Sequence, residues 1–227
     1  VLGDLFRRFC PEQKITELCT NVSERFRDFR RVTYRDGGTL SDEALAENLR
    51  EQNQALCIVN TRKAAQALYA LLPEEGRYHL STLMYPAHRK QVLCTVRERL
   101  RQGLPCRVVS TSLIEAGVDV DFPMVWRETA GLDSIAQAAG RCNREGKRDP
   151  EFSIVTYFQS EHAVPVLQGI PIQAAREALR KDGDPAKPET MQHYFTALRS
   201  LIGENMDKSA VIKTTTDNNL PMETVTK

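Results

Sequence analysis

The chain has 227 residues, 41% of them hydrophobic, which is enough for one substantial core or for one core with an appendage. Its 31 Lys and Arg balance 30 Asp and Glu, so net charge predicts no polyanionic partner, and any contact with nucleic acid must depend on where the charges lie. Every apolar stretch falls well short of the roughly 20 residues that a membrane-spanning helix needs, so the sequence predicts no membrane partner.

The six cysteines form no C-x-x-C pair and no cluster with the four histidines, so they predict no metal site. Cys57, Cys94 and Cys106 lie in apolar runs, where a small buried thiol is the simpler interpretation, and such thiols suit a reducing cytoplasm. The first residues, "VLGDLFRRFC", have neither an initiator Met nor a signal-peptide core. We therefore expect a cytoplasmic protein, and a chain that is a piece of something longer.

The first part of the chain predicts helix. Residues 1–32 repeat apolar side chains at helical spacing, as an amphipathic helix does. The letters "YRDGG" predict a break, and "SDEALAENLREQ" predicts another helix with Ser41 or Asp42 as its N-cap. We expect a helical lead-in over residues 1–35.

Further along, short apolar runs alternate with amphipathic patterns. This alternation predicts parallel strands joined by crossover helices, the doubly wound α/β class, over residues 36–160. The expected strands are "ALCIVN", "YHLSTLM", "CRVVS", "PMVWRE" and "FSIVTYF". The expected helices between them are "RKAAQALYALL", "AHRKQVLCTVRERLRQ" and one that begins at about Asp133. Residues 161–227 predict a helical extension, with helices at "IPIQAAREALRK" and "PETMQHYFTALRSLI", and then a polar, threonine-rich tail.

Polar residues follow several of the expected strands. In an open parallel sheet, ligands bind at the carboxyl ends of the strands. Small residues and hydroxyls there let backbone N–H groups approach a phosphate, and capping of the next helix is the alternative interpretation. The hydroxyls suited to nucleic-acid phosphates are Thr61, Ser81, Thr82, Thr111 and Ser112. A local basic surface is expected around Arg62, Arg89 and Lys90.

Two arginines follow a glycine in "QAAGRCNREG". Read as a helix, the positions i, i+3, i+4 and i+7 form one face that holds Gln137, Gly140, Arg141 and Arg144. A glycine in mid-helix costs about 1 kcal/mol relative to Ala, which indicates that something must approach closely there. Guanidinium groups bind phosphate oxygens with two parallel hydrogen bonds, so this face favours a phosphate ligand. The alternative is that the arginines pair with Glu115, Glu128 or Glu145.

Four segments in order resemble one family. "CIVNTRKAAQ" resembles motif IV of superfamily 2 helicases, "LSTLMYPAHR" motif IVa, "STSLIEAGVDVD" motif V and "QAAGRCNREG" motif VI. Together, "IEAGVDVDFP" and "LDSIAQAAGRCNREG" most resemble the CRISPR-associated helicase–nuclease of type I systems, the effector recruited by Cascade. The resemblance implies a RecA-like fold, the second lobe of an ATP-driven motor that unwinds and degrades foreign DNA.

The resemblance also implies residue roles. Arg144 would be the arginine finger on the transferring γ-phosphate of ATP, and Arg141 would contact the same phosphates. Asp119 would accept a hydrogen bond from the ATP ribose. Gly117 and Gly140 would allow the nucleotide to approach the backbone closely, and Gln137 would couple the two motor lobes. The residues that would hold the backbone of single-stranded DNA are Thr61, Arg62, Ser81, Thr82, Thr111 and Ser112.

Several parts of such a motor are missing from the sequence. It contains no G-x-x-x-x-G-K-[ST] to cradle phosphates, no D-E-x-[DH] for Mg²⁺, and no adjacent His-Asp pair for the nuclease. We therefore expect ATP and Mg²⁺ to be shared with an absent first lobe, and this chain alone to be nearly inert. Its expected partners are single-stranded DNA, Cascade, the missing nuclease and first lobe, and a protein inhibitor. Another superfamily 2 helicase or restriction translocase, or an inert interaction module, remains the alternative.

Overall fold

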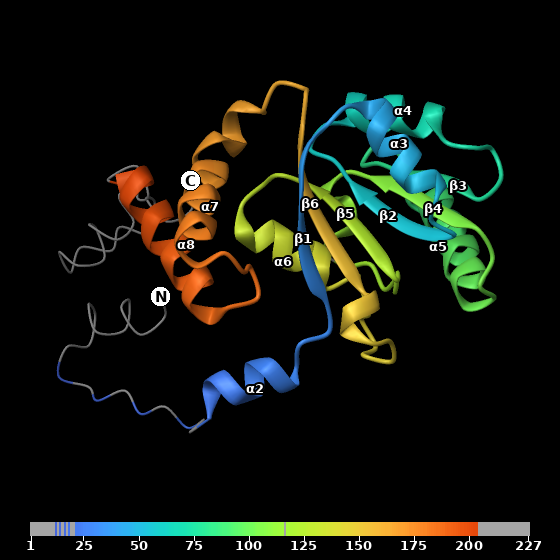
Figure 1. The fold of residues 1–227 in the computed structure, drawn as a ribbon. Coiled ribbons are helices and arrows are strands. Elements are labelled where there is room, and N and C mark those ends of the chain that lie inside the picture. Colours follow the sequence, from blue (N-terminus) through green and yellow to red (C-terminus); the bar gives the residue numbers. More distant parts are fainter. Residues whose placement is uncertain are drawn as a thin grey trace, which may run out of the picture.

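The computed structural model describes residues 21–203 except Ala116, together with residues 12, 14, 16 and 18. One sheet of six parallel strands, in the order β1-β6-β5-β2-β4-β3, forms the centre of this region (Figure 1). The strands are β1 (Thr33–Leu40), β2 (Gln54–Ile58), β3 (Arg77–Leu80), β4 (Cys106–Ser110), β5 (Met124–Glu128) and β6 (Ile154–Ser160). The parallel order through β2, β4 and β5 confirms the predicted doubly wound class.

Helices cover both faces of the sheet. The α-helices are α2 (Val22–Asp28), α3 (Asp42–Arg50), α4 (Arg62–Leu71), α5 (Pro86–Arg101), α6 (Leu132–Ala139), α7 (Gly169–Asp182) and α8 (Pro188–Ile202). Short 3₁₀ turns are η1 (Ser112–Ile114), η2 (Pro150–Phe152) and η3 (Val166–Gln168). Ser41, one of the two residues predicted for that role, caps α3, and Thr61 caps α4; each accepts a hydrogen bond from a backbone N–H in the first turn.

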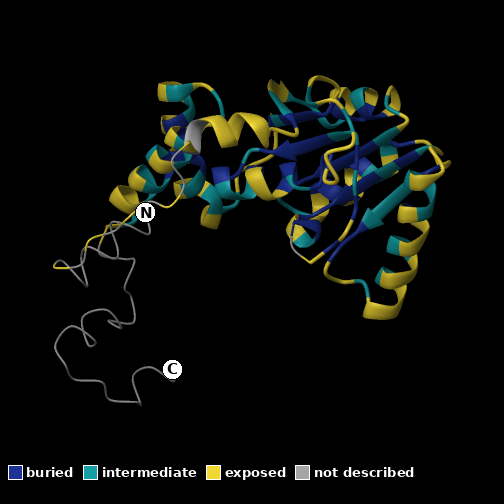
Figure 2. Cartoon of the chain, turned by 90° about the horizontal axis from the view of Figure 1, so that it is seen from below, coloured by how far each residue is buried: buried dark blue, intermediate teal, exposed yellow. Residues whose placement is uncertain are grey.

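The core has two halves because β2 is buried on both faces. Leu56 and Ile58 pack on the side that carries α5 and α6, whereas Ala55 and Cys57 pack on the side that carries α3 and α4. Figure 2 shows the strands as the most buried part of the molecule, with the outer faces of the helices exposed. This double burial explains why the sequence of β2 is an unbroken apolar run.

Strand β1 corrects the expectation of a break at "YRDGG". The segment Thr33–Leu40 is an edge strand that pairs with β6, and its register shifts between Asp36 and Thr39. Gly38 adopts a φ of 64° in this bulge, and its N–H donates to Asp36 Oδ1 at 2.9 Å. The glycines that predicted a turn therefore form a bulge within a strand. Of the helix expected over 1–32, the described residues contain α2 alone, and most of residues 1–20 lie outside them.

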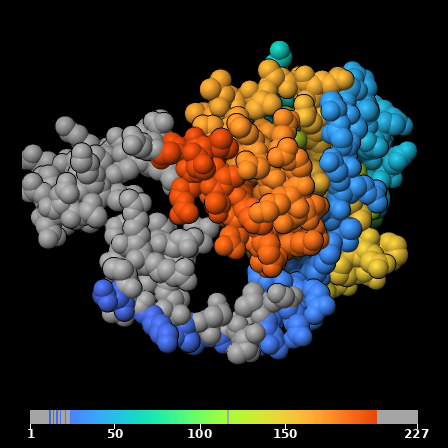
Figure 3. Space-filling model, turned by 60° about the vertical axis from the view of Figure 1, so that its left-hand side comes forward, coloured from blue at the N-terminus to red at the C-terminus, as the bar shows by residue number. Residues whose placement is uncertain are grey.

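The extension consists of α7 and α8, in agreement with the two helices expected there. The two helices pack on α6 through a third apolar cluster that includes Leu132, Ile135 and Tyr194. The Tyr194 hydroxyl donates to Asp133 Oδ1 at 2.6 Å. Figure 3 shows the extension, in orange and red, beside the first strand and the residues that precede it, in blue. The polar tail from about residue 205 lies outside the described residues, and the division into 1–35, 36–160 and 161–227 stays a prediction.

Within the described residues, none of the helices combines the length and the apolar character that crossing a membrane requires.

Candidate functional site

The hydroxyl-rich segments gather at the carboxyl edge of three neighbouring strands. Ile58 at the end of β2 pairs with Ser110 at the end of β4, and Leu80 at the end of β3 pairs with the same Ser110. Thr61, Ser81 and Thr111 follow these strand ends within three residues. The tertiary structure thus brings the candidate DNA-contacting segments to one edge, as parallel strands require.

The candidate hydroxyls differ in accessibility along that edge. Thr82, Ser112 and the neighbouring Arg62 are exposed, whereas Ser81 and Thr111 are buried. Thr61 Oγ1 accepts a hydrogen bond from the Ala64 N–H at 3.1 Å, so the capping alternative describes its present role. Its hydroxyl proton remains available to a ligand, because the cap uses only the acceptor.

The arginine helix ends earlier than predicted. Helix α6 stops at Ala139, and Gly140 is its C-cap rather than a mid-helix residue. The N–H of Phe122 donates to the Arg141 carbonyl at 2.9 Å, and the N–H of Asn143 donates to the Phe122 carbonyl at 3.0 Å. Because residues 141–143 pair with Phe122 in this way, they do not continue the helix. Gln137 is exposed on α6, but Arg141 and Arg144 are not part of that helix.

Arg141 is buried, which corrects the expectation of an exposed guanidinium. Its exposed fraction is 7%, and its Nε and Nη2 donate to the carbonyls of Ile114 and Glu115 at 2.9 and 2.5 Å. Burial lowers the pKa of Arg141, and the nearby positive charge of Arg144 lowers it further. Arg141 therefore holds the loop between β4 and β5 in place.

Arg144 lies on the turn that follows, with its side chain 42% exposed. Its Nε is 2.9 Å from Asp119 Oδ1, and the Asp119 side chain is 79% exposed. Gly117, two residues earlier, is exposed and has a φ of 69°, a conformation that favours glycine. Two residues predicted for one nucleotide site thus contact each other at an accessible surface.

This surface is at the amino edge of the sheet, opposite the hydroxyls. The turn pairs with Phe122, just before β5 begins, and Arg31 Nη1, just before β1, donates to the Arg144 carbonyl at 2.5 Å. The loop of residues 111–121 runs from the carboxyl end of β4 to this edge. It therefore joins the two groups of candidate residues.

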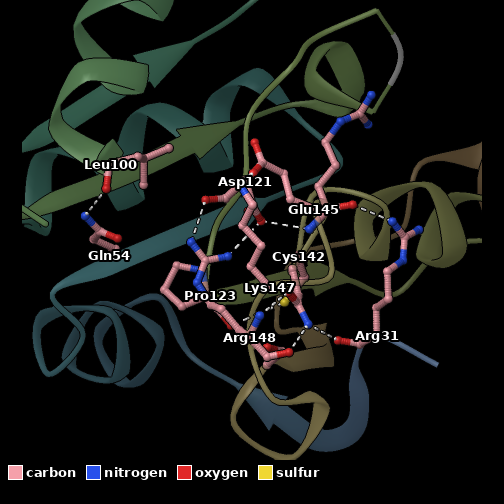
Figure 4. A network of polar contacts seen from close by, with 12 residues as sticks. Arg31, Gln54, Leu100, Asp121, Pro123, Cys142, Glu145, Lys147 and Arg148 are labelled. Atoms are coloured by element: carbon pink, nitrogen blue, oxygen red, sulfur yellow. Dashed lines mark hydrogen bonds and ion pairs between the residues drawn. The ribbon is translucent and has the colours of Figure 1, made fainter. Parts of the chain in front are cut away.

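A hydrogen-bonded network fixes the turn that carries Arg144 (Figure 4). Asp121 Oδ1 accepts from the Arg144 N–H and from Arg148 Nη1, both at 2.8 Å. Asn143 is buried with a φ of 45°; its Nδ2 donates to the carbonyls of Arg31 and Arg148, and its Oδ1 accepts from the Arg148 N–H. Sequence reasoning missed these positioning residues, because their partners lie far apart along the chain.

Replacing Asn143 by Ala should lower the free energy of unfolding by about 2–4 kcal/mol, because three hydrogen bonds are lost and Ala disfavours a positive φ. Urea unfolding followed by circular dichroism measures this loss. Asn143→Gly is the matched control: it loses the same bonds but tolerates the backbone, so its loss should be smaller. Equal losses in both variants would show that the backbone conformation contributes nothing.

A buried ion pair lies behind the loop, and the sequence analysis did not predict it. Arg127, on β5, is only 1% exposed, and its Nε is 2.8 Å from Glu115 Oε1. Its Nη1 also donates to Asn60 Oδ1 and to the Glu128 carbonyl, both at 2.7 Å. Burial raises the pKa of Glu115, and the adjacent Arg127 opposes that rise. In the alternative interpretation of the two arginines, Glu115 was a possible partner of Arg141 or Arg144, whereas its carboxylate pairs with Arg127.

In residues 21–203, as far as they are described, no three His, Cys, Asp or Glu side chains gather where they could bind one ion.

Comparison with known proteins finds one family to which part of this chain is similar. The model of the family described as CRISPR-associated nuclease/helicase Cas3, C-terminal, matches residues 51–147. The nuclease/helicase Cas3 of Haloferax volcanii is 58% identical over 41 residues, which cover 18% of this chain and 4% of that protein. The Cas3 of Methanothermobacter thermautotrophicus is 26% identical over 140 residues, which cover 59% of this chain and 17% of that protein.

Solved structures share the fold. A crystal structure of T. fusca Cas3-ATP superimposes with a TM-score of 0.57 and 17% identity, covering 94% of this chain and 27% of that one. A CRISPR RNA-guided surveillance complex, pre-nicking, contains a chain that matches with a TM-score of 0.54 and 18% identity, covering 83% of this chain and 27% of that one. The chain spans 17% or less of the length of the two curated relatives. Residues 51–147 are thus similar to the C-terminal region of the CRISPR-associated nuclease/helicase Cas3, and the fold of the described residues is that of a RecA-like helicase lobe.

Proposed function

We propose that this chain is the second motor lobe of an ATP-dependent helicase or translocase that moves on single-stranded DNA. One observation carries the proposal: the Arg144 guanidinium is accessible and is held by Asp119, on a turn fixed by buried Asn143. A cation at an open surface, on a turn whose backbone is fixed, is suited to stabilising charge on a phosphoryl group. In a helicase, that group belongs to ATP bound by the facing lobe.

The nucleotide would lie between Arg144 and an absent first lobe. Asp119 could accept a hydrogen bond from the ribose, and Gly117 leaves room for the nucleotide to approach the backbone closely. Gln137, which is exposed on α6, and Gly140 are the remaining candidates for contact with the nucleotide. Arg141 acts through the loop it binds and is a positioning residue. ATP supplies the transferable phosphoryl group, and Mg²⁺ would be held by the first lobe. Crystal structures of T. fusca Cas3-ATP, Cas3-ADP and Cas3-AMPPNP share this fold, which supports nucleotide use by it.

Single-stranded DNA would lie along the carboxyl edge, on Thr61, Arg62, Thr82 and Ser112, with Ser81 and Thr111 supporting the edge from beneath. The surveillance-complex structure supports a Cascade-type partner, and unwinding with degradation of foreign DNA would need the nuclease of a larger protein. The free thiols of Cys57 and Cys106 are buried and support a reducing, cytoplasmic setting, whereas Cys94, also expected to be buried, is exposed. A protein inhibitor remains a proposed partner without a located surface.

Titration of a fluorescent single-stranded oligonucleotide with the purified chain, at two salt concentrations, tests the DNA part of the proposal. We expect weak binding that is indifferent to base sequence and weakens with salt, because phosphate contacts dominate. Arg62→Ala should reduce the slope of log affinity against log salt by about 0.7, the value for one phosphate contact on a single strand.

Arg101→Ala is the matched control. Arg101 is exposed at the carboxyl-terminal end of α5, which lies at the amino edge of the sheet, and it pairs with Glu98. The Arg101→Ala variant should leave the slope unchanged. Tight binding that ignores salt, or an equal effect of both variants, would contradict the proposed DNA path.

A further inference from the structure

An exposed aromatic pair stands beside the proposed DNA path. Tyr85, in the segment that leaves β3 and leads into α5, is 67% exposed. The imidazole ring of His88, on the first turn of α5, lies 5.6 Å from the Tyr85 ring, centroid to centroid, at an interplanar angle of 39°. Leu83 is also exposed on this segment. Burial does not explain these apolar surfaces, since most of the Tyr85 ring faces solvent.

The pair lies in a basic stretch of the carboxyl edge. Residues 59–65 leave β2 and residues 81–91 leave β3 at that edge, and together they contain four Lys or Arg and no Asp or Glu. The positive charges are Arg62, Lys63, Arg89 and Lys90. An exposed aromatic ring beside positive charges is a combination by which proteins bind single-stranded nucleic acid, because the charges attract phosphates and the ring stacks on a base.

The local backbone supports a role outside folding. Tyr85 is the N-cap of α5, yet among the described residues its side chain makes no capping hydrogen bond. The turn before it is held by other groups: the Met84 N–H donates to the Ser81 carbonyl at 3.2 Å, and the Leu83 N–H donates to Ser81 Oγ at 3.4 Å. Removal of the Tyr85 ring therefore leaves the contacts that shape this segment intact.

We propose that Tyr85, whose ring contacts that of His88, stacks on a base of the single-stranded DNA whose phosphates bind along the carboxyl edge. This inference rests on the proposed function, and it adds a base contact to a path otherwise made of phosphate contacts. Stacking tolerates any base, because each base has a π-face, so Tyr85 contributes affinity without sequence specificity.

The test compares the whole 227-residue chain with its Tyr85→Ala variant on two ligands: a single-stranded oligonucleotide, and an abasic strand of equal length and charge. We expect Tyr85→Ala to weaken binding to the strand with bases by about 5- to 150-fold, as stacking on one base implies. It should leave binding to the abasic strand unchanged, and Tyr85→Phe should behave like the unsubstituted chain. A 2-aminopurine in the strand should be quenched by the unsubstituted chain and not by Tyr85→Ala.

Phe152→Ala is the matched control, because Phe152 is 73% exposed and lies at the amino edge beside Asp149 and Glu151. It should change neither affinity nor quenching. If the chain binds DNA with the expected salt dependence, but Tyr85→Ala and Phe152→Ala behave alike, the stacking inference fails and the proposed function stands. The inference also fails if Tyr85→Ala weakens binding to the abasic strand equally. If the unsubstituted chain binds neither ligand, the proposed function fails with it.

Discussion

Arg144→Ala should lower ATP hydrolysis by about 10³–10⁵-fold in a protein that unites this chain with a first helicase lobe, in cis or in trans. The reason is electrostatic: a guanidinium aimed at the transferring phosphoryl group stabilises charge that develops in the transition state. A steady-state phosphate-release assay with saturating single-stranded DNA measures the loss. Affinity for DNA should stay nearly unchanged, because Arg144 lies at the amino edge and the proposed DNA path at the carboxyl edge.

Arg97→Ala is the matched control for Arg144. Arg97 is an exposed arginine on α5 whose Nε donates to the Asp119 carbonyl at 2.7 Å, so it contacts the same loop without belonging to the turn. Its replacement should reduce turnover far less. The 227-residue chain alone should hydrolyse no ATP, since its sequence contains no phosphate-binding G-x-x-x-x-G-K-[ST]. Robust hydrolysis by the chain alone, or loss of DNA binding with normal turnover in Arg144→Ala, would overturn the assignment.

Arg127→Ala should lower the free energy of unfolding by about 3–5 kcal/mol, because it leaves the Glu115 carboxylate buried without its partner. Urea unfolding gives this loss directly. The deficit relative to the unsubstituted chain should shrink as the pH falls from about 8 to about 5. Without Arg127, burial holds the pKa of Glu115 above its unfolded value, so the folded variant binds more protons than its unfolded state and gains stability with acid.

A double variant separates the ion pair from simple loss of volume. Arg127→Met with Glu115→Gln removes both charges and fills much of the space, so it should be more stable than Arg127→Ala and should lose the extra pH dependence. If the double variant is as unstable as Arg127→Ala at every pH, the loss comes from packing and from the Asn60 contact rather than from an unpaired charge.

The sequence by itself determined the elements whose cause is local. The apolar runs of β2 and β4 identified buried parallel strands, and Ser41 and Thr61 identified helix starts, because a hydroxyl one residue before a helix accepts a hydrogen bond from its first turn. Its motifs also named Asp119 and Arg144, which the structure brings into contact.

Only the tertiary structure decided the rest. Helix α6 ends at Ala139 because the backbone of the residues after it forms hydrogen bonds with Phe122, and helical periodicity does not predict that pairing. The same pairing turns Arg141 inward onto two loop carbonyls and leaves Arg144 accessible. The "DGG" of β1 became a bulge because β6 supplied a neighbouring strand. In each case a partner far away in the sequence satisfies backbone or charged groups, and local patterns of residues carry no information about such partners.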